Sequence, residues 1–495
     1  MDMSLALITL IVGVVALLVK LYSAHNYFSR RNIPYDKPRG LLGGRISTKS
    51  MPLLLWEMYK KGEGHKLFGF FVLWSPSILI RDPELIKQIL VKDFSFFYNR
   101  GMYVNEDREP LTGHLFALEG EPWRKLRTKL SPAFTSGKMK VMFETIVKYS
   151  DKLVDHIKKN PKGEPLECQS LMIKYTLSNI AATAFGIEPD VFEEDSPFMK
   201  MAIKFTAPSL ELFAKTFLFF NLKSVTHLLP FTMIQKDVST FYLDLMREAV
   251  SLREKGNVVG TDFLQMLIQL KNKGFIEGSS AEDKNCLTAN QIAAQAFVFI
   301  VAGYETSASA LSWALYELAL NPDVQLRLQE EVDSVEEWTY ENILGLQYLD
   351  MVLNETLRKY PSVPFLIRKC GENYRVPESD MVLEKGSLIG VSLYGLHMDP
   401  KLFPDPDKFD PERFGPNPSH EIKPYTYLPF GEGPRFCIGT RFAKVQSKVG
   451  LATMMRHFTV EPTEKTTIPV VLHSHAFQPI NKNGNWLRFK KRTRD

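Results

Sequence analysis

The chain has 495 residues, of which 45% are hydrophobic and 24% charged, so it can bury a large core. Its 61 Lys and Arg residues nearly balance its 56 Asp and Glu residues, and no basic stripe is visible, which argues against nucleic-acid binding. The four cysteines are widely spaced without a Cys-x-x-Cys pair, so neither a disulfide framework nor a zinc site of the usual spacing is expected.

The amino terminus differs from the rest of the chain. Residues 3–19 are uncharged and strongly apolar, and Lys20 and Arg30 follow them. An apolar run of this length is near the lower limit for spanning a bilayer, and the basic residues behind it favour a cytosolic body. A cleaved signal peptide is the alternative, but no small-residue cleavage site ends the run. We expect a transmembrane anchor over residues 1–22 and a basic, Pro- and Gly-rich hinge over 23–44.

Residues 45–495 are expected to form one large domain, because no repeat or low-complexity linker divides them. Helical spacing or composition dominates, and strand-like runs are short. The expected helices cover residues 140–158, 170–185, 198–216, 237–255, 261–273, 289–320, 322–335, 347–360 and 438–457. The expected strands lie near residues 67–80, 363–376, 387–391 and 486–490. This pattern predicts a mainly α fold with small β-sheets.

The predicted helix over residues 289–320 is exceptionally long. Thr288 and Gln291 have the spacing of a capping box at its start, and Pro322 marks its end. Thirty-two residues would span about 48 Å at 1.5 Å per residue. Such a helix can cross a whole domain.

The middle of this helix carries Gly303, Glu305 and Thr306 within an apolar stretch. Taken separately, the glycine fits a helix-packing contact and the polar residues fit a solvated face. At the centre of a buried helix, however, polar groups are costly unless they have partners. The three residues together therefore indicate a site.

The strongest chemical signal is the run from Pro429 to Gly439, where a loop rich in Gly and Pro delivers Cys437 to the start of an apolar helix. Glycines permit tight turns and close approach to a flat ligand, and a helix start stabilises a thiolate. A thiolate bound to haem iron favours O–O cleavage. Arg435 could meet an anionic edge of such a cofactor. A lone cysteine in a loop is usually an inert thiol. Whether Cys437 is instead a ligand therefore depends on the residues around it.

Those neighbours resemble the haem-binding loop of cytochromes P450. The matching residues are Phe430, Gly431, Gly433, Arg435, Cys437 and Gly439. The resemblance covers about residues 30–490 and implies the cytochrome P450 fold, haem b as the cofactor and Cys437 as the iron ligand. Residues 435–443 and 134–140 are most similar to the insect microsomal branch of the family.

Two further motifs resemble structural elements of the family. Glu355 and Arg358 match its Glu-x-x-Arg pair, and Arg413 matches its second arginine motif. Residues three apart share one face of a helix. The resemblance implies a buried ion triad of these three residues that supports the cysteine loop.

The resemblance also assigns cofactor contacts. Trp123 and Arg127, on a short helix opened by Pro122, are similar to the family's pair that contacts the haem propionates. Arginine suits bidentate carboxylate binding, and tryptophan offers one N–H donor. The expected cofactor-binding residues are Arg100, Trp123, Arg127, Arg368, Phe430 and Arg435. A plain surface arginine is the alternative for each of the arginines.

Glu305 and Thr306 match the family's acid–alcohol pair above the haem and are the expected catalytic residues. The implied role is a proton relay during oxygen activation. An intact alcohol at this position favours monooxygenation over peroxide rearrangement.

The resemblance implies a monooxygenase that inserts one oxygen atom from O₂ into lipophilic foreign compounds such as plant toxins or insecticides. NADPH–cytochrome P450 reductase would supply electrons, with cytochrome b5 as a second candidate partner. The enzyme would contact membrane lipid, with its catalytic domain on the cytosolic side of the endoplasmic reticulum. A dedicated hormone or lipid biosynthetic oxidase and a haem carrier or sensor without turnover are the alternatives.

Several segments are candidates for contacting substrate or the reductase, with core packing and surface solvation as the alternatives. The substrate candidates are residues 101–118, 205–220 with Phe213, Phe217, Phe219 and Phe220, Phe297, Val301, 363–367 and 473–477. The basic candidates for steering an acidic partner are Lys129, Lys138, Lys140, Arg441, Lys444 and Lys448. The connection over residues 330–340 is shorter than is usual in the family, which would alter only the local surface.

Overall fold

The structure is a computed structural model. It describes residues 22, 26–37, 51–72, 75–160, 163–193, 196–207, 209, 211, 214–215, 232–256, 262–277, 285–418, 420–474 and 476–493. The predicted anchor lies outside these residues except for Tyr22, as does much of the predicted hinge. Among the described residues, no helix is both long enough and apolar enough to cross a membrane.

The described chain is mainly helical with small sheets, as predicted. Its α-helices are α2 (Met51–Lys61), α3 (Pro83–Lys87), α4 (Gly120–Leu130), α5 (Ser136–Lys158), α6 (Cys168–Phe185), α7 (Pro197–Thr206), α10 (Lys236–Gly256), α11 (Phe263–Asn272), α12 (Ala289–Leu320), α13 (Pro322–Asp333), α14 (Tyr340–Gly345), α15 (Gln347–Lys359), α16 (Leu393–His397) and α17 (Thr440–His457). Shorter helical turns are η1 (Ser29–Arg31), η2 (Gln88–Lys92), η3 (Phe94–Phe96), η4 (Pro110–Thr112), η5 (Ser131–Phe134) and η6 (Pro411–Phe414). The strands are β1 (Leu67–Val72), β2 (Ser75–Ile80), β3 (Leu166–Glu167), β4 (Phe365–Lys369), β5 (Tyr374–Arg375), β6 (Val382–Leu383), β7 (Leu388–Ser392), β8 (Phe458–Pro462) and β9 (Trp486–Lys491).

The helix predicted over residues 198–216 is interrupted, because α7 ends at Thr206. Among the described residues that follow, Glu211, Ala214 and Lys215 are helical again. Ala207 leaves the helical region with ψ 134°, and Pro208 follows it. A residue before proline is disfavoured in the α conformation, which accounts for the stop.

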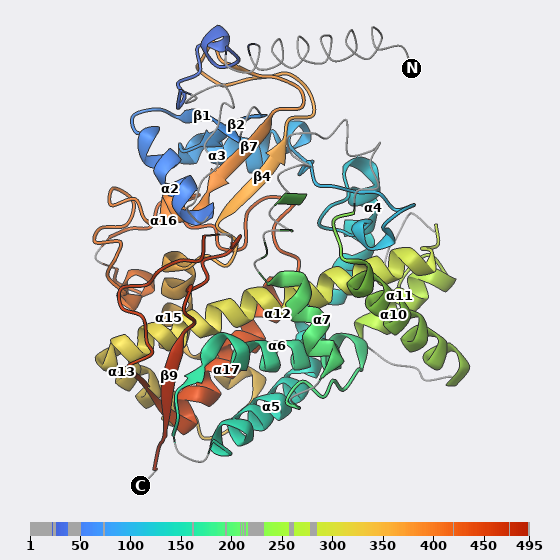
Figure 1. Cartoon of the computed structure of the whole chain (residues 1–495), viewed down its shortest axis with the longest axis vertical. Helices are drawn as coiled ribbons and strands as arrows, with labels where there is room; N and C mark the ends of the chain where they lie inside the picture. The colour runs from blue at the N-terminus through green and yellow to red at the C-terminus, as the bar shows by residue number, and fades with distance from the viewer. Residues whose placement is uncertain are drawn as a thin grey trace, which may run out of the picture.

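The largest sheet joins residues 67–80 to residues 365–392 and has the strand order β1-β2-β7-β4. Strand β2 pairs in parallel with β7, with Ser77 opposite Leu388, and β7 pairs antiparallel with β4. Figure 1 shows this sheet at one end of the molecule and most of the helices at the other. A smaller sheet has the order β3-β9-β8, and β5 pairs with β6.

Helix α12 begins with the predicted capping box. The Thr288 N–H donates to Gln291 Oε1 at 3.0 Å, and the Gln291 N–H donates to Thr288 Oγ1 at 3.1 Å. The helix ends at Leu320, directly before Asn321 and Pro322, so both predicted boundaries are confirmed.

Helix α12 crosses the helical part of the molecule and packs closely on α6 (Figure 1). A Cβ added to Gly303 would lie 2.9 Å from an Ile180 side-chain carbon, closer than the two helices allow. Gly303 is therefore a helix-packing contact. On its other flank, Gln446 of α17 donates Nε2–H to the Gly303 carbonyl at 2.7 Å, so α6 and α17 together fix the middle of α12.

Candidate functional site

The loop before α17 is held in a tight fold by its own backbone. The Cys437 N–H donates to the Phe430 carbonyl at 2.9 Å, and the Phe436 N–H donates to the Gly433 carbonyl at 2.9 Å. Gly431 and Gly433 both have positive φ, at 73° and 72°, a conformation that favours glycine. These turns bring Cys437 back beside Phe430 and fix where its thiol can point.

Gly433 also lies against η2. A Cβ at this position would be 1.9 Å from the Leu90 carbonyl oxygen, which leaves no room for any side chain. The sequence suggested that the loop glycines allow a flat ligand to approach. For Gly433 the close neighbour is instead the protein's own backbone, which anchors the loop to the end of the molecule that carries the sheet.

Cys437 is accessible to solvent, although protein atoms surround it. Burial raises the pKa of its thiol, while the Gly439 N–H, the Thr440 hydroxyl and the charges of Arg127 and Arg100 act to lower it. Helix α17 begins only at Thr440, so its first turn lies beyond the cysteine and does not outweigh burial. A coordinating metal ion deprotonates a thiol outright. A bound iron would therefore convert Cys437 to the thiolate, which the surrounding protein groups alone do not favour.

Four arginines lie near one another beside this loop. Burial lowers the pKa of Arg435 to about 9, with Arg368 and Arg127 adding to the effect and Glu119 opposing it. Burial lowers the pKa of Arg100 well below its usual range, and the charges of Arg368, Arg435 and Arg127 lower it further. All four guanidinium groups still carry their charge at neutral pH. Arg368 and Arg435 are buried and Arg100 and Arg127 are half-buried, so the cluster concentrates positive charge largely away from solvent.

The hydrogen bonds of these arginines show which donors are committed. Arg435 donates hydrogen bonds from Nε, Nη1 and Nη2 to the carbonyls of Tyr98, Leu115 and Leu118. These bonds tie the cysteine loop to residues 98–118. Arg100 donates to the carbonyls of Phe116 and Arg435.

Arg127 and Arg368 have more donors available than the other two. Arg368 donates only to the Ile367 carbonyl, at 2.9 Å, and its buried Nε has no hydrogen-bond partner in the described structure. The Arg127 guanidinium makes no hydrogen bond to the described residues, and the Arg127 carbonyl accepts one from Ser131 Oγ at 2.7 Å. A cofactor with two carboxylates would offset part of the positive charge of the cluster and accept hydrogen bonds from Arg368, so the residues present fit a haem with its propionates.

Two aromatic side chains, Trp123 of α4 and Phe436 of the cysteine loop, stack on these cations. The Arg435 guanidinium lies 3.9 Å from the Trp123 ring centroid, and the Arg127 guanidinium lies 4.9 Å from that of Phe436. Cation–π contacts hold a guanidinium in place while leaving its N–H groups free to bind. Trp123 thus orients Arg435, besides offering the single N–H donor expected from the sequence.

The middle turn of α12 opens to solvent-accessible space. Ala302 is exposed and Thr306 is half-buried, whereas Ile300 and Tyr304 are fully buried. Thr306 Oγ1 donates to the Ala302 carbonyl at 2.8 Å, and Ser362 Oγ donates to the Thr306 carbonyl at 2.9 Å. The hydroxyl hydrogen is directed at the helix backbone here, and its lone pairs can still accept.

Glu305 lies on a different side of α12 from Thr306. Its carboxyl group accepts a hydrogen bond from Thr206 Oγ1 of α7 at 3.3 Å. Burial raises its pKa to about 7, and the bond from Thr206 acts in the opposite direction. The acid and the alcohol are neighbours in sequence but have separate partners.

The predicted ion triad is confirmed. Arg358 Nε and Nη2 donate to the two carboxylate oxygens of Glu355 at 2.7 and 2.9 Å, and Arg413 Nε lies 3.4 Å from Glu355 Oε1. The side chains of Glu355 and Arg358 are completely buried, and that of Arg413 is 9% exposed. Arg358 also donates to the His397 and Pro406 carbonyls, so the triad ties α15 to the chain that leads to the cysteine loop.

His397 connects this triad to the loop and was not found from the sequence. The Leu428 N–H donates to His397 Nε2 at 3.4 Å, so Nδ1 carries the hydrogen that reaches the Arg358 carbonyl at 3.1 Å. Burial, together with the charge of Arg358, lowers its pKa to about 3, which keeps the ring neutral. Because Leu428 lies just before Phe430, the imidazole helps position the carbonyl that receives the Cys437 N–H. No local sequence pattern marks such a residue.

Removing one charge of the triad should strongly destabilise the protein. Glu355→Gln leaves two buried guanidinium groups without a carboxylate, and we expect the free energy of unfolding to fall by about 3–5 kcal/mol. Denaturant unfolding of the haem-loaded protein measures this. The matched control is Arg327→Gln, which breaks the exposed pair of Arg327 with Glu412 and should cost about 0–1 kcal/mol. Equal losses in the two variants would contradict a supporting role for the triad.

The candidate contact surfaces need several corrections. Phe297 is 2% exposed and its ring packs on Phe205 and Tyr242, with centroids 5.0 and 5.1 Å away, so it belongs to the core. Lys129 is 5% exposed and Lys448 is 4% exposed, so neither can steer a partner at the surface. Lys129 donates to the Gly274 and Asn285 carbonyls, whereas Lys448 donates to the Leu344 and Leu346 carbonyls and pairs with Asp350.

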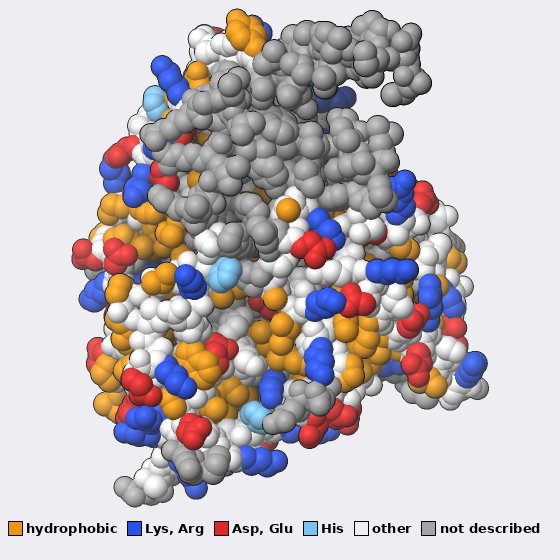
Figure 2. All heavy atoms as spheres, in the orientation of Figure 1, with side chains coloured by type: hydrophobic (Ala, Val, Ile, Leu, Met, Phe, Trp, Pro, Cys, Tyr) orange, Lys and Arg blue, Asp and Glu red, His pale blue; other side chains and the backbone are white. Residues whose placement is uncertain are grey.

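The other basic candidates, Lys138, Lys140, Arg441 and Lys444, are at least partly exposed. Lys140 pairs with Glu341 at 2.6 Å, and Arg441 and Lys444 are exposed. On the face shown in Figure 2, positive and negative side chains of the described residues are interspersed. The candidates Phe213, Phe217, Phe219 and Phe220 lie outside the described residues.

The domain is mainly helical and presents a cysteine in a loop that glycines turn back beside a cluster of arginines. A long helix carries an acid and an alcohol. Together these are features of a haem monooxygenase. The sequence matches the family "Cytochrome P450" over residues 40–487, and the chain belongs to that family. It is a cytochrome P450 monooxygenase, and its cofactor is haem b.

Insect proteins are among the relatives that match over nearly their whole length, in agreement with the branch predicted from the sequence motifs. The chain is 39% identical to probable cytochrome P450 6a13 of Drosophila melanogaster, over 98% of this chain and 99% of the relative. It is 38% identical to cytochrome P450 6a2 of the same species, with the same coverage. It is also 38% identical to cytochrome P450 6A1 of Musca domestica, over 96% of each chain.

Proposed function

We propose that this monooxygenase oxidises lipophilic foreign compounds, such as plant toxins or insecticides, with electrons from NADPH delivered by NADPH–cytochrome P450 reductase. The observation that carries the proposal is the middle turn of α12. Ala302 is exposed and Val301 half-buried within a helix whose other residues are mostly buried. A molecule bound there would meet apolar surface and the Thr306 hydroxyl, which suits a lipophilic substrate.

We further propose a role for each site residue. Cys437 ligates the haem iron, and Phe430 contacts the cofactor from the same loop. Arg127 and Arg368, which have the most uncommitted donors, bind the propionates with help from Arg100, Arg435 and Trp123. The arginine cluster also excludes any other cation from this edge of the site.

Haem, when bound, supplies the activation of O₂. The chain's own part is to deliver protons to it. Thr306 can turn its hydroxyl hydrogen from the Ala302 carbonyl towards the reacting oxygen by rotation about one side-chain bond. Glu305, whose pKa is raised to about 7, can hold a proton at neutral pH and resupply the site. Since the two side chains have separate partners, a water molecule or a rotation of Glu305 must connect them.

The test is turnover of the full chain with the reductase, NADPH and a panel of lipophilic compounds, with products identified. We expect NADPH consumption and mono-oxygenated products from several unrelated members of the panel. Turnover confined to one steroid or lipid would instead indicate a dedicated biosynthetic oxidase. Haem binding with no substrate-dependent consumption of NADPH would indicate a carrier or sensor. Addition of cytochrome b5 tests whether it is a second partner.

We propose that residues 1–22 anchor the protein in the endoplasmic reticulum membrane, with the domain over 45–495 facing the cytosol behind the 23–44 hinge. The support is the uncharged run 3–19 with basic residues behind it. Protease added to intact microsomes should therefore digest the domain. Full protection until detergent is added would overturn this topology.

A further inference from the structure

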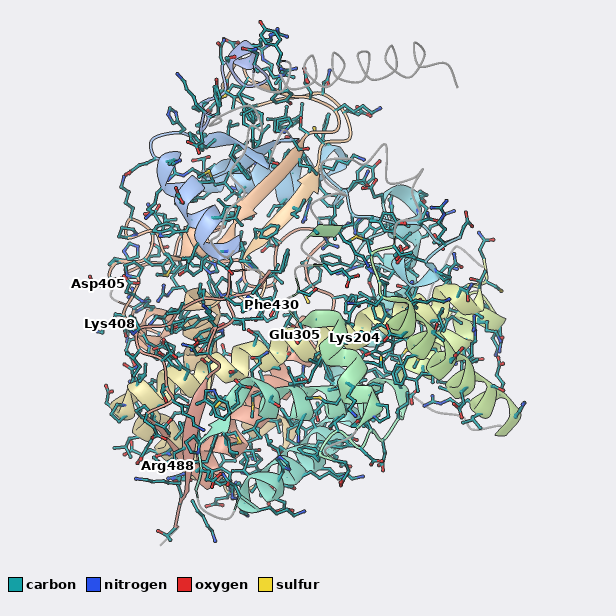
Figure 3. The ribbon with its side chains drawn as sticks, in the orientation of Figure 1. Lys204, Glu305, Asp405, Lys408, Phe430 and Arg488 are labelled. Atoms are coloured by element: carbon teal, nitrogen blue, oxygen red, sulfur yellow. The ribbon has the colours of Figure 1, made fainter. Side chains whose placement is uncertain are left out.

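Glu305 is held by a neighbouring helix at the point where that helix ends. Thr206, the last residue of α7, places Oγ1 3.3 Å from Glu305 Oε2, and α7 lies across the middle of α12 in Figure 1. Glu305 itself is 7% exposed. Figure 3 labels Glu305 of α12 and Lys204 of α7, which lies two residues before Thr206. Thus the only hydrogen bond of the carboxyl group within the described structure comes from α7.

The surrounding hydroxyls form a chain that depends on the protonation of Glu305. Tyr304 Oη donates to the Ala202 carbonyl at 2.8 Å, and Thr206 Oγ1 lies 3.0 Å from Tyr304 Oη. If Glu305 is neutral, its O–H can donate to Thr206, Thr206 to Tyr304, and Tyr304 to the carbonyl. If Glu305 is ionised, Thr206 must turn its single hydrogen to the carboxylate, and Tyr304 loses a donor.

Among the residues that the structure describes, no charge near Glu305 competes with Thr206 for this carboxyl group. Lys204 of α7 is already paired with Asp237 of α10, and both are about half exposed. The other titratable groups facing this region are the Tyr304 hydroxyl of α12 and the Tyr242 hydroxyl of α10, whose pKa values are both raised by burial. Both stay neutral over the working pH range. The Thr206 hydroxyl is therefore the polar group that opposes the cost of ionising Glu305.

We propose that Thr206 is a positioning residue for proton delivery, and that its hydroxyl fixes the direction of the Glu305 carboxyl group and sets the pH at which that group loses its proton. The proposal rests on the role proposed above for Glu305 as the proton source. According to this proposal, a residue in the last turn of α7 controls the ionisation of Glu305 on α12.

A simpler reading is that Thr206 only bonds its own helix, since Oγ1 is also 3.3 Å from the Ala202 carbonyl, four residues earlier. Threonines often make such a bond. The two readings differ in what a hydroxyl-free side chain of the same shape would do. Thr206→Val keeps the shape and removes the hydroxyl, whereas Thr206→Ser restores it.

The experiment measures product formed per NADPH consumed as a function of pH, with the full haem-loaded chain and reductase. A proton donor works while protonated, so coupling should be high below the pKa of Glu305, about 7, and fall above it. Thr206→Val removes the group that lowers this pKa, so the fall should move to higher pH by about one unit, a tenfold change in the ionisation constant. Thr206→Ser should return the fall to its wild-type position.

A second measurement is independent of turnover. The infrared C=O band of the protonated carboxyl group, identified by its loss in Glu305→Gln, can be titrated in each variant. An unchanged titration in Thr206→Val would overturn the proposal. If the band shifts as expected but Glu305→Gln keeps the wild-type pH dependence of coupling, then Thr206 positions Glu305 and the proton source proposed above is wrong. Equal haem content in all variants controls for misfolding.

Discussion

Replacing Cys437 with alanine is expected to abolish the long-wavelength Soret band of the reduced carbon monoxide adduct and, with it, all oxidation of substrate. That band reports a thiolate bound to iron, and the cysteine loop presents one accessible thiol beside the arginine cluster. The arginines and the α12 residues are unchanged in this variant, so some haem can still bind. The spectrum of the reduced protein under carbon monoxide is the measurement.

The other cysteines provide matched controls. Cys286 is exposed and far along the chain from the loop, and Cys370 is buried with its sulfur 2.7 Å from the Glu372 carbonyl. Cys286→Ala should keep both the band and activity. If Cys437→Ala protein retained the band, the assignment of the ligand would be wrong. Circular dichroism would show whether a lost band reflects lost folding instead.

The features predicted well from the sequence are those fixed by neighbours along the chain. The capping box at Thr288 and the proline after Asn321 are local signals, and α12 has the predicted boundaries. The ion triad was also predicted, although Arg413 is remote from Glu355 in sequence, because the resemblance supplied the long-range pairing. The composition of the chain alone could not have done so.

The features missed from the sequence are contacts between remote elements. The Thr206 bond to Glu305 joins α7 to α12, and the close approach of Gly433 to Leu90 joins the cysteine loop to η2. Periodicity shows which face of a helix is apolar but not which element covers it. For the same reason, Lys129 and Lys448 looked like surface charges, although each is buried with its amine bonded to backbone carbonyls.

Replacing Thr306 with alanine is expected to uncouple oxygen use from product formation. Haem and substrate binding should persist, because neither needs the hydroxyl, and reduction should persist, because the Cys437 side of the site is untouched. Proton delivery should fail, so that hydrogen peroxide is released in place of product. General acid catalysis contributes about 10²–10⁴-fold, which sets the scale of the expected loss of product. The measurement is product formed and peroxide released per NADPH consumed.

The structure also supports an alternative to the proton-delivery role of Thr306, in which its hydroxyl only bonds the helix backbone. Thr306 Oγ1 donates to the Ala302 carbonyl at 2.8 Å, as a threonine with only a helix-bonding function would do. Thr306→Ser keeps a hydroxyl that can make the same bond and can also turn away from it, so it should retain most of the coupling. Thr306→Val keeps the branched shape without the hydroxyl and should behave like Thr306→Ala. If both hydroxyl-free variants couple as well as the wild type, Thr306 is structural, and Glu305 becomes the first candidate for direct proton delivery.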